Sequence, residues 1–552
     1  MHWQTKFALQ PRRAAQDMSA MYFRSLSCLL GLVLTLAAPV AARAAGTARH
    51  FVLVVWDGMR PDYVTPELTP TLCSLRSNGV WFAHHHCAYP TSTEVNGAVL
   101  ATGAFPQRTG IGGNLEYRRA LHPLQPYRTQ SLGAIRRGDE LTGGKYVALP
   151  TVAEAVQAAG LTTAVAGAKS VVLFQDRRVR PEGALGRIWF AEGALPESLF
   201  RMLTRRLGNF PAPDSPNIAR DLWATRCLAE AFWEGAVPRY SVLWLSEPDY
   251  SQHMHGPGSA EALAALRSCD QRLAMILTEL ERRGLRAQTD VLVVSDHGFS
   301  TIGANADVAA ALRAAGLRAG AVWLRPPADG DVVVVGNGGS VLLYVTGGST
   351  NRIRQVVRTL QHQRCAGVLF TREPMPGTFP LAEAMIAAPT APDIVMASRW
   401  IQPTSTNTHP VSLIFNDGYS EFDAGCGMHA TLCPTDLHCT AIACGPDFRA
   451  GLTDPLPSGN VDIAPTLLWL LGLAPAQRLD GRVLHEALRA QGPAPGPATP
   501  GRREARAELG DVVWEQYLNF TELAGVRYLD EGNGGWKPVA ATARPKASAA
   551  SR

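Results

Sequence analysis

Short apolar runs rich in β-branched residues, separated by long helical patterns, limit this chain to one class of fold. The runs are FVLVVWD at 51–57, TTAVAG at 162–167, SVLWLSEP at 241–248 and DVLVVSD at 290–296. Runs that are apolar throughout, rather than alternating, are typical of strands covered on both faces. With helical stretches such as 260–284 between them, they predict an α/β fold with a largely parallel sheet flanked by helices on both faces.

Acidic side chains follow three of these runs. Asp57 is the last residue of the first run, and Asp249 follows the third. Asp296 is the last residue of the fourth run and is followed by His297. In open α/β sheets, ligands bind at the carboxyl ends of the strands, where the loops converge. Mixed carboxylate and imidazole groups are metal ligands that suit zinc better than calcium or magnesium. We therefore expect a metal site there.

Two further histidines extend this set. His253 lies four residues after Asp249, which places both on one face of a helical turn. His255 competes for the same role, but the spacing of four favours His253. His429 lies in GCGMHATLC at 425–433, whose small residues allow a close approach to another group. It is the candidate that completes the ligand set.

Other histidines look less suited to binding a metal. His84, His85 and His86 are consecutive, and consecutive residues of an extended segment point to opposite faces, so we predict a solvated loop. For His438 we expect a packing role or the orientation of a neighbouring group.

A nucleophile candidate precedes a predicted helix. Pro90 marks a turn and the helix is expected from Glu94 onward, so Thr93 falls at the helix start. A hydroxyl there meets free backbone N–H groups and the positive end of the helix dipole, which favour negative charge and phosphate oxygens. A nearby divalent cation would deprotonate it. Ser92 and Thr91 are alternatives by composition, and a plain helix cap is the alternative role for Thr93.

Several motifs follow one another in a characteristic order. They are Asp57 at a strand end, PTSTEVN at 90–96, TGIGGN at 109–114, PDYSQH at 248–253, SDHG at 295–298, His429, VDIAPT at 461–466 and LDGR at 479–482. In this order they resemble the type I phosphodiesterase and nucleotide pyrophosphatase family of the alkaline phosphatase superfamily. The resemblance covers roughly residues 50 to 485 and implies an alkaline-phosphatase-like fold.

The resemblance also implies two zinc ions as cofactors. One would be held by Asp249, His253 and His429, and the other by Asp57, Asp296 and His297, with the Thr93 oxygen bound to the latter. Two metals a few ångströms apart activate the attacking oxygen and stabilise the leaving one. Thr93 would then form a covalent phosphoryl intermediate that water releases.

The resemblance assigns the substrate contacts as well. Asn114 would donate a hydrogen bond to a non-bridging phosphate oxygen. The position after the threonine is usually aromatic in the family and is Glu94 here, which cannot stack on a base. Glu94 and Asn114 are the expected substrate-binding residues, and the partner is a small phosphoester.

Three functions stay open at this point. The first is the hydrolysis of phosphodiester or pyrophosphate bonds. The second is phosphomonoester or phosphonate hydrolysis by the same superfamily, and the third is a non-catalytic binding protein in which metals are only structural. The sequence Cys87-Ala-Tyr-Pro-Thr argues against a sulfatase, because it does not match the Cys/Ser-x-Pro-x-Arg sequence that a sulfatase nucleophile requires.

The amino-terminal segment resembles an export signal. After a polar lead, residues 21–46 combine Arg24, an apolar run and small residues, which predicts a signal peptide cut near Ala44 and a periplasmic or secreted enzyme. Membrane attachment is expected only if this segment stays uncleaved. Of the net charge of +5, residues 1–44 carry +4, so the rest of the chain has no strongly basic balance and we expect no nucleic acid recognition.

The chain is expected to divide into a core, an insert and a carboxyl-terminal extension. After the signal and polar lead at 1–44, residues 45–300 and 425–490 form the catalytic core, and 301–424 an inserted cap subdomain. Proline, alanine and glycine mark 491–510 as a linker. Residues 511–552 would form a short packed segment, a helix and a strand, and a disordered tail.

Four cysteines surround His429. They are Cys426, Cys433, Cys439 and Cys444. In an oxidising compartment one disulfide among them would pin the loop that carries His429. A cysteine-rich zinc knuckle is the alternative, although paired Cys-x-x-Cys units are lacking.

Overall fold

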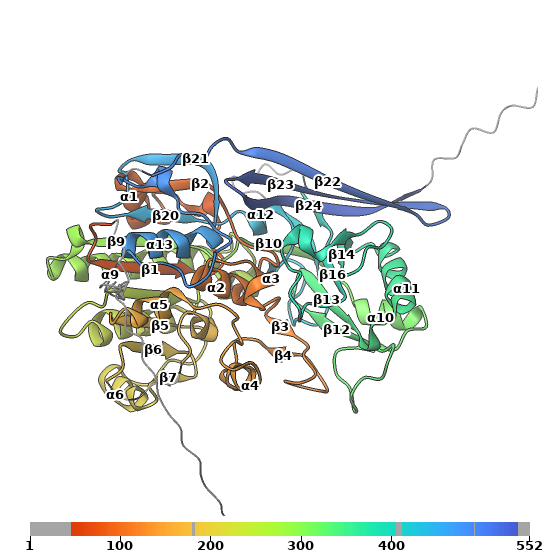
Figure 1. The fold of residues 1–552 in the computed structure, drawn as a ribbon, viewed down its shortest axis with the longest axis horizontal. Coiled ribbons are helices and arrows are strands. Elements are labelled where there is room, and N and C mark those ends of the chain that lie inside the picture. Colours follow the sequence, from red (N-terminus) through yellow and green to blue (C-terminus); the bar gives the residue numbers. More distant parts are fainter. Residues whose placement is uncertain (1–45, 179–180, 182, 404–410, 491, 539–552) are drawn as a thin grey trace, which may run out of the picture. The chain divides into compact units, whose positions relative to one another are not determined.

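The largest sheet among the described residues has nine strands (Figure 1). The computed structural model describes residues 46–538 except 179, 180, 182, 404–410 and 491. The middle of the sheet has the order β9 (Thr289–Val294), β1 (His50–Trp56), β8 (Tyr240–Leu245), β5 (Thr163–Gly167) and β6 (Gly186–Phe190), and all five strands are parallel. The predicted, largely parallel sheet is confirmed, and four of its strands are the apolar runs of the sequence.

Antiparallel pairs occur toward both edges of this sheet. Beyond β9 lie β20 (Ala441–Cys444), β2 (Val80–His86) and β21 (Leu452–Gly459), and beyond β6 lies β7 (Gly193–Leu195). β20 is antiparallel to both β9 and β2, and β7 is antiparallel to β6. The sheet is therefore mixed, with its parallel part at the centre.

Helices cover both faces of the sheet. Alternate residues of β1 point to opposite sides: Phe51, Leu53 and Val55 join one apolar core, and the residues between them join the other. The first core is closed by α2 (Thr93–Thr102), α5 (Val152–Ala158) and α13 (Ile463–Leu471), and the second by α1 (Pro70–Asn78), α7 (Ile218–Arg226) and α9 (Ala260–Arg282). The expected helical cover on both faces is confirmed.

The stretch between His297 and His429 forms two smaller sheets. One has six strands in the order β11 (Ala319–Gly320), β12 (Val332–Gly336), β13 (Ser340–Val345), β16 (Ile394–Ser398), β14 (Ala366–Thr371) and β15 (Phe379–Pro380), and it packs with α10 (Val308–Ala314) and α11 (Thr350–Gln361). The other consists of β17 (Trp400–Ile401), β18 (Leu413–Asn416), β10 (Ser300–Asn305) and β19 (Gly427–Met428). The latter runs into the loop of His429.

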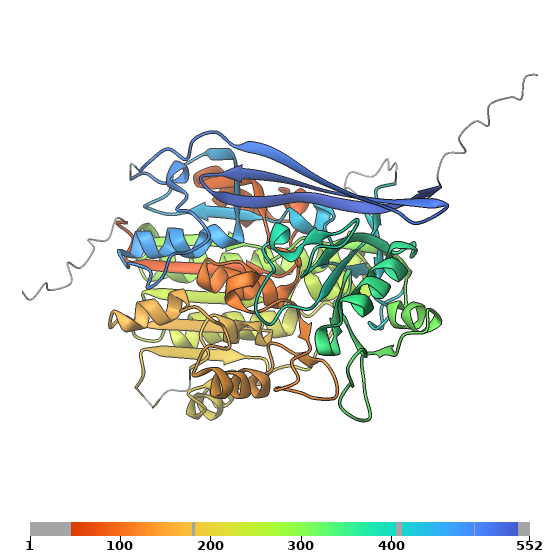
Figure 2. The same cartoon turned by 45° about the vertical axis from the view of Figure 1, so that its right-hand side comes forward.

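The carboxyl-terminal region differs from the prediction. Residues expected to be a linker contain β22 (Thr499–Glu508), and the expected helix and strand are two strands, β23 (Val512–Leu523) and β24 (Val526–Pro538). These three form an antiparallel sheet that runs past β2, β21 and β14 (Figures 1 and 2). Pairing with β23 along ten residues makes the polar, proline-containing segment 499–508 a strand despite its composition.

Some predictions fall outside the described residues or are not realised. The signal peptide and the last part of the tail, 539–552, lie outside the described residues. Within residues 46–538, no described helix is long and apolar enough to cross a bilayer. All nine described cysteines are free thiols, so the expected bridge near His429 is not formed in this structure.

Candidate functional site

The candidate site lies at the carboxyl ends of adjacent parallel strands. Asp57 follows β1 directly, Asp249 opens α8 (Asp249–His255) after β8, and Asp296 comes two residues after β9. Since β1 pairs with both β8 and β9, the three carboxylates reach the same edge of the sheet.

Gly58 allows the three chain segments to meet. Its φ of +72° is a left-handed conformation, and a Cβ there would lie 3.1 Å from the Cβ of Asp249 and 2.9 Å from the ring of Phe299. The Gly58 N–H donates to Asp296 Oδ1 at 3.0 Å. A tight turn after β1 thus brings Asp57 against the other two carboxylates.

Asp57, Asp296 and His297 form the first group. Their ligand atoms lie within 4.8 Å of one another, and all three side chains are fully buried. His297 Nε2 is 3.6 Å from Asp57 Oδ1 and 3.5 Å from Asp296 Oδ2. Because His297 Nδ1 lies 2.8 Å from the carbonyl of Gly298, which can only accept, its proton is at Nδ1 and Nε2 is free to bind a cation.

Asp249, His253 and His429 form the second group, with ligand atoms equally close together. Asp249 Oδ1 is 3.2 Å from His253 Nε2 and 3.6 Å from His429 Nε2. Each Nδ1 again points at a carbonyl, that of Gly427 at 3.0 Å and that of Thr91 at 2.8 Å. His255, the alternative to His253, lies apart from this group, with its Nε2 2.9 Å from Ser215 Oγ.

The electrostatics of both groups suit cations. Burial and the neighbouring Asp296 carboxylate raise the pKa of Asp57 well above its usual range. Burial lowers the pKa of His297 and lowers that of His429 well below its usual value, so both rings are neutral. Asp296 Oδ2 and Asp249 Oδ1 are buried without a hydrogen-bond partner. Divalent cations would satisfy these lone pairs and relieve the repulsion between carboxylates.

Thr93 is the first residue of α2 and lies beside the first group. Its Oγ is 3.2 Å from His297 Nε2 and 3.5 Å from Asp57 Oδ1, and the side chain is buried. The hydroxyl of Thr91 donates instead to the carbonyl of Thr431, and Ser92 Oγ is buried without a partner. Of the three neighbouring hydroxyls, Thr93 is the one that the structure brings to the histidine and carboxylate group.

Lys169 was missed by the sequence analysis. Its Nζ lies 2.9 Å from Asp57 Oδ2 and 2.8 Å from Asp249 Oδ2, so it bridges the two groups. Although burial alone would lower it, these two carboxylates hold the pKa of Lys169 well above its usual value. Lys169 follows β5, which pairs with β8. The run 162–167 was predicted to be a strand. Lys169 lies two residues after it, and this position at the carboxyl end of a strand is the signal that could have identified the lysine.

Asn114 and Glu94 meet at the start of α2. Asn114 Oδ1 accepts from the N–H of Glu94 at 3.2 Å, which leaves the Asn114 NH₂ group available to donate. Glu94 is 3% exposed and its Oε2 is buried without a hydrogen-bond partner. Burial raises the pKa of Glu94 to about 7, against the opposing charge of Lys169.

Two of the three consecutive histidines differ from the prediction of a solvated loop. They end strand β2, and both His85 and His86 are buried. His85 contacts Ser458 and Asn460 through its two ring nitrogens, at 2.9 and 3.1 Å. His84 is exposed as expected.

Known proteins resemble this chain in sequence and fold. It is 25% identical over 257 residues to a venom phosphodiesterase of Macrovipera lebetinus, and 24% identical over 262 residues to ectonucleotide pyrophosphatase/phosphodiesterase family member 1 of Mus musculus. The matches cover 46% and 44% of this chain but only 26% and 23% of those longer relatives.

The same relationship is seen in three dimensions. Murine ectonucleotide pyrophosphatase/phosphodiesterase 5, solved as an inactive variant in complex with AMP, matches with a TM-score of 0.57 at 16% identity, covering 80% of this chain and 100% of that chain. This confirms the alkaline-phosphatase-like α/β fold. A family model described as type I phosphodiesterase / nucleotide pyrophosphatase matches residues 51–419, more than half of the sequence. The chain therefore belongs to the type I phosphodiesterase and nucleotide pyrophosphatase family.

Proposed function

We propose that this protein is a zinc-dependent hydrolase of phosphodiester or pyrophosphate bonds in which Thr93 is the nucleophile. The observation that carries this proposal is the position of Thr93 Oγ, at the positive end of α2 and 3.2 Å from His297 Nε2. A hydroxyl in that place is suited to attack a phosphate that is held against the helix end and the two histidine and carboxylate groups.

The donor set supports two zinc ions. The first group, Asp57, Asp296 and His297, would hold one, and the second, Asp249, His253 and His429, the other. Three imidazoles direct Nε2 lone pairs at carboxylates, an arrangement that needs a cation between the acceptors. Bound zinc would lower the pKa of the Thr93 hydroxyl and neutralise charge on the phosphate.

The residues of the chain then divide the reaction into two displacements. In the first, the Thr93 oxygen attacks phosphorus, the bond from phosphorus to the leaving alcohol or phosphate breaks, and a phosphothreonine results. In the second, water attacks the same phosphorus, the bond from phosphorus to the Thr93 oxygen breaks, and a proton from the water restores the hydroxyl as the phosphate product leaves. The N–H groups of α2 and the free NH₂ of Asn114 would hydrogen-bond the non-bridging oxygens, while Lys169 offsets their negative charge.

The substrate is proposed to be a small phosphoester. A structural relative was solved with AMP, which makes nucleotide esters one class to test. Glu94, next to the nucleophile, has no ring to stack on a base and favours a hydroxyl-rich or cationic substituent. The resemblance of residues 21–46 to an export signal supports a periplasmic or secreted location.

The decisive experiment compares three chromogenic esters with chelated and zinc-reloaded protein. They are bis-p-nitrophenyl phosphate, p-nitrophenyl phosphate and the p-nitrophenyl ester of thymidine monophosphate. We expect turnover to return with zinc and to be greater for the two diesters. Faster hydrolysis of the monoester would assign a phosphatase. Zinc bound at both groups around Thr93 without turnover of any ester would contradict the proposal.

A further inference from the structure

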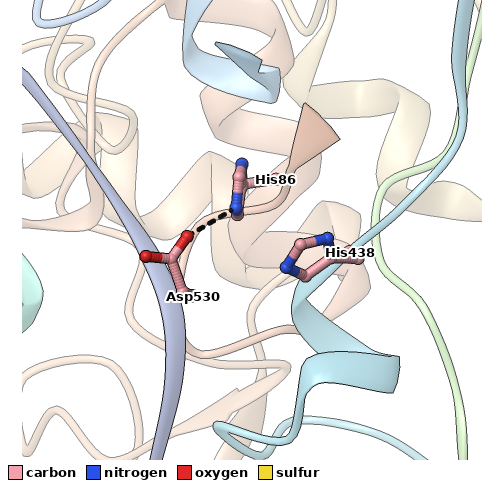
Figure 3. A group of neighbouring side chains, drawn as sticks. All are labelled: His86, His438 and Asp530. Carbon is pink, nitrogen blue, oxygen red and sulfur yellow. Dashed lines mark hydrogen bonds and ion pairs between the residues drawn. The ribbon is translucent and has the colours of Figure 1, made fainter. Parts of the chain in front are cut away.

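A third group of metal-ligand side chains lies away from Thr93 and the two groups around it. His86 ends β2, His438 directly follows α12 (Pro434–Leu437), and Asp530 lies on β24. Their ligand atoms lie within 4.8 Å of one another. Figure 3 shows the three side chains turned toward one another from three separate segments. No metal role was expected from the sequence for any of them.

The backbone fixes the two histidines relative to each other. His86 and His438 form an isolated antiparallel bridge, with Cys87 N–H donating to the carbonyl of Leu437 at 2.9 Å and Cys439 N–H to that of His85 at 3.0 Å. The two ring centroids are 4.5 Å apart. This pairing places the two imidazoles side by side.

The contact between His86 and Asp530 needs a positive charge. His86 Nδ1 is 3.1 Å from the carbonyl of Ser458, so it carries the proton of the neutral ring. His86 Nε2 is then a lone pair directed at Asp530 Oδ1, also an acceptor, only 3.1 Å away. Either a second proton or a cation must lie between them. The ring nitrogens of His438 have no hydrogen-bond partner among the described residues, so a cation there could also use this neighbouring imidazole.

Partners outside the group orient its ligands. The carbonyl of Ser458, at the end of β21, fixes the ring of His86, and the Thr521 hydroxyl donates to Asp530 Oδ2 at 2.9 Å. The other oxygen of Asp530, Oδ1, therefore remains available to a metal ion between the three side chains. Ligating histidines and carboxylates in zinc proteins are held by such outer hydrogen bonds. These outer hydrogen bonds therefore hold the His86 ring and the Asp530 carboxylate in the orientation that a shared metal ion requires.

We propose that His86, His438 and Asp530 form a third zinc site, separate from the proposed catalytic pair, which fastens the carboxyl-terminal sheet to the core. Two imidazoles and one carboxylate are a ligand set that zinc favours. His438 and Asp530 also line an open pocket of about 590 Å³, from which water can supply the fourth ligand. Zinc binding here joins β2 and β24, which are far apart in sequence.

The sheet has other attachments, so we expect a moderate effect on stability. Gly532 N–H donates to the carbonyl of Leu432 at 2.9 Å, and the Tyr528 hydroxyl to Asp462 at 2.8 Å. Loss of zinc from this site should therefore weaken the attachment of β24 without unfolding the core. The proposal does not depend on the reaction assigned to Thr93.

The test is the zinc content of the mature protein after loading and gel filtration. Asp530→Asn keeps the size of the side chain and the Thr521 contact, and we expect it to bind one zinc per chain fewer than the parent, as should His438→Gln. His84→Gln, an exposed neighbour on β2, should bind as much zinc as the parent. Zinc-saturated Asp530→Asn should retain the ester hydrolysis of the parent, which shows that it is folded.

A measurement on the unmodified protein makes the outcome independent of how the variants fold. Crystals of the zinc-loaded parent, recorded at the zinc absorption edge, should give an anomalous peak between His86, His438 and Asp530. Absence of that peak, or unchanged zinc content in both variants, would overturn the proposed third zinc site.

Discussion

The ammonium group of Lys169 lies 2.8 Å from Asp249 Oδ2, a contact between the loop after β5 and the first turn of α8. It places one fixed positive charge between the two groups that we propose to bind zinc. The proposed phosphoryl transfer would bring additional negative charge to this point, so the lysine is suited to stabilising that reaction as well as balancing the carboxylates.

Replacing Lys169 by Gln should therefore separate catalysis from metal binding. We expect kcat/KM for bis-p-nitrophenyl phosphate to fall on the order of 100-fold. Zinc affinity should stay the same or rise, because no ammonium group competes for Asp249. Steady-state kinetics with zinc titration check both, and Lys145→Gln, at an exposed lysine, is the control. An unchanged kcat/KM would exclude a catalytic role for Lys169.

Removal of the Thr93 hydroxyl should abolish turnover without removing the metals. Thr93→Ala is expected to lose on the order of 10⁴-fold or more in kcat, whereas Thr93→Ser should keep part of it. Acid quenching with a substrate labelled at phosphorus should trap a phosphoprotein in the parent but not in Thr93→Ala. Ser92→Ala is the neighbouring control. Label that persists in Thr93→Ala would move the nucleophile elsewhere.

We expect opposite effects on zinc content and activity when the two histidines of α8, His253 and His255, are replaced. His253→Ala should lose about one zinc per chain and most of the activity, since its Nε2 lies 3.2 Å from Asp249 Oδ1. His255→Ala should keep both, because its ring contacts Ser215 instead. Metal analysis of the two variants in parallel provides the comparison. If His255→Ala lost zinc and His253→Ala did not, our ligand assignment would be wrong.

Asp57, Asp249 and Asp296 could be predicted to meet at the sheet edge because each follows an apolar run. His253 and His429 depended on other signals, the spacing of four from Asp249 and the small residues around His429. A strand that ends in Asp57, or in Asp296 and His297, carries its position in the adjacent sequence. Lys169 follows a strand in the same way, but its run is short and rich in alanine and glycine, and the lysine was overlooked. The pattern of each strand thus identified the candidate metal ligands that directly follow it in the sequence.

Contacts between distant segments could not be predicted in this way. Asp530 on β24 contacts His86 on β2 although the two residues are far apart in the chain, and no spacing in the sequence links them. In β23, alternate residues such as Trp514, Leu518 and Phe520 are buried, but Gln516 is buried between them, paired with the backbone of Leu369. The buried glutamine interrupts the alternation of apolar and polar residues that is typical of a strand, and the prediction of a short helix here was wrong.

The buried pair of Asp290 and Asp447 should make stability depend on pH. Burial, reinforced by Asp447, raises the pKa of Asp290 to about 8, while an unfolded chain releases this proton near pH 4. The stabilising contribution of Asp290 is therefore fully present below about pH 4 and is lost as the pH rises through about 8.

Asp290→Asn imitates the protonated carboxyl and should remove this loss. We expect its urea midpoint to exceed that of the parent by a margin that grows from pH 5 and levels off above about pH 8. Asp511→Asn, at an exposed position, should show no such trend. A margin that is independent of pH would mean that Asp290 is ionised in the folded protein.

Glu94 should give the reaction a pH dependence that a glutamine lacks. With its pKa raised by burial to about 7, Glu94 is neutral at pH 6 and charged at pH 8, directly after the proposed nucleophile Thr93. A phosphodiester is anionic over this whole range, so only the enzyme changes charge. Ionisation of Glu94 places a negative charge beside the bound phosphate and should lower kcat/KM on the order of 10-fold between these two pH values.

The Glu94→Gln variant keeps the size of the side chain but cannot ionise. Its kcat/KM for bis-p-nitrophenyl phosphate should stay high where that of the parent falls, while the two proteins agree at pH 6. Zinc must be kept saturating at every pH, so that metal loss is not mistaken for the effect of Glu94. Parallel profiles for the two proteins would mean that Glu94 does not titrate in this range or lies too far from the phosphate to act on it.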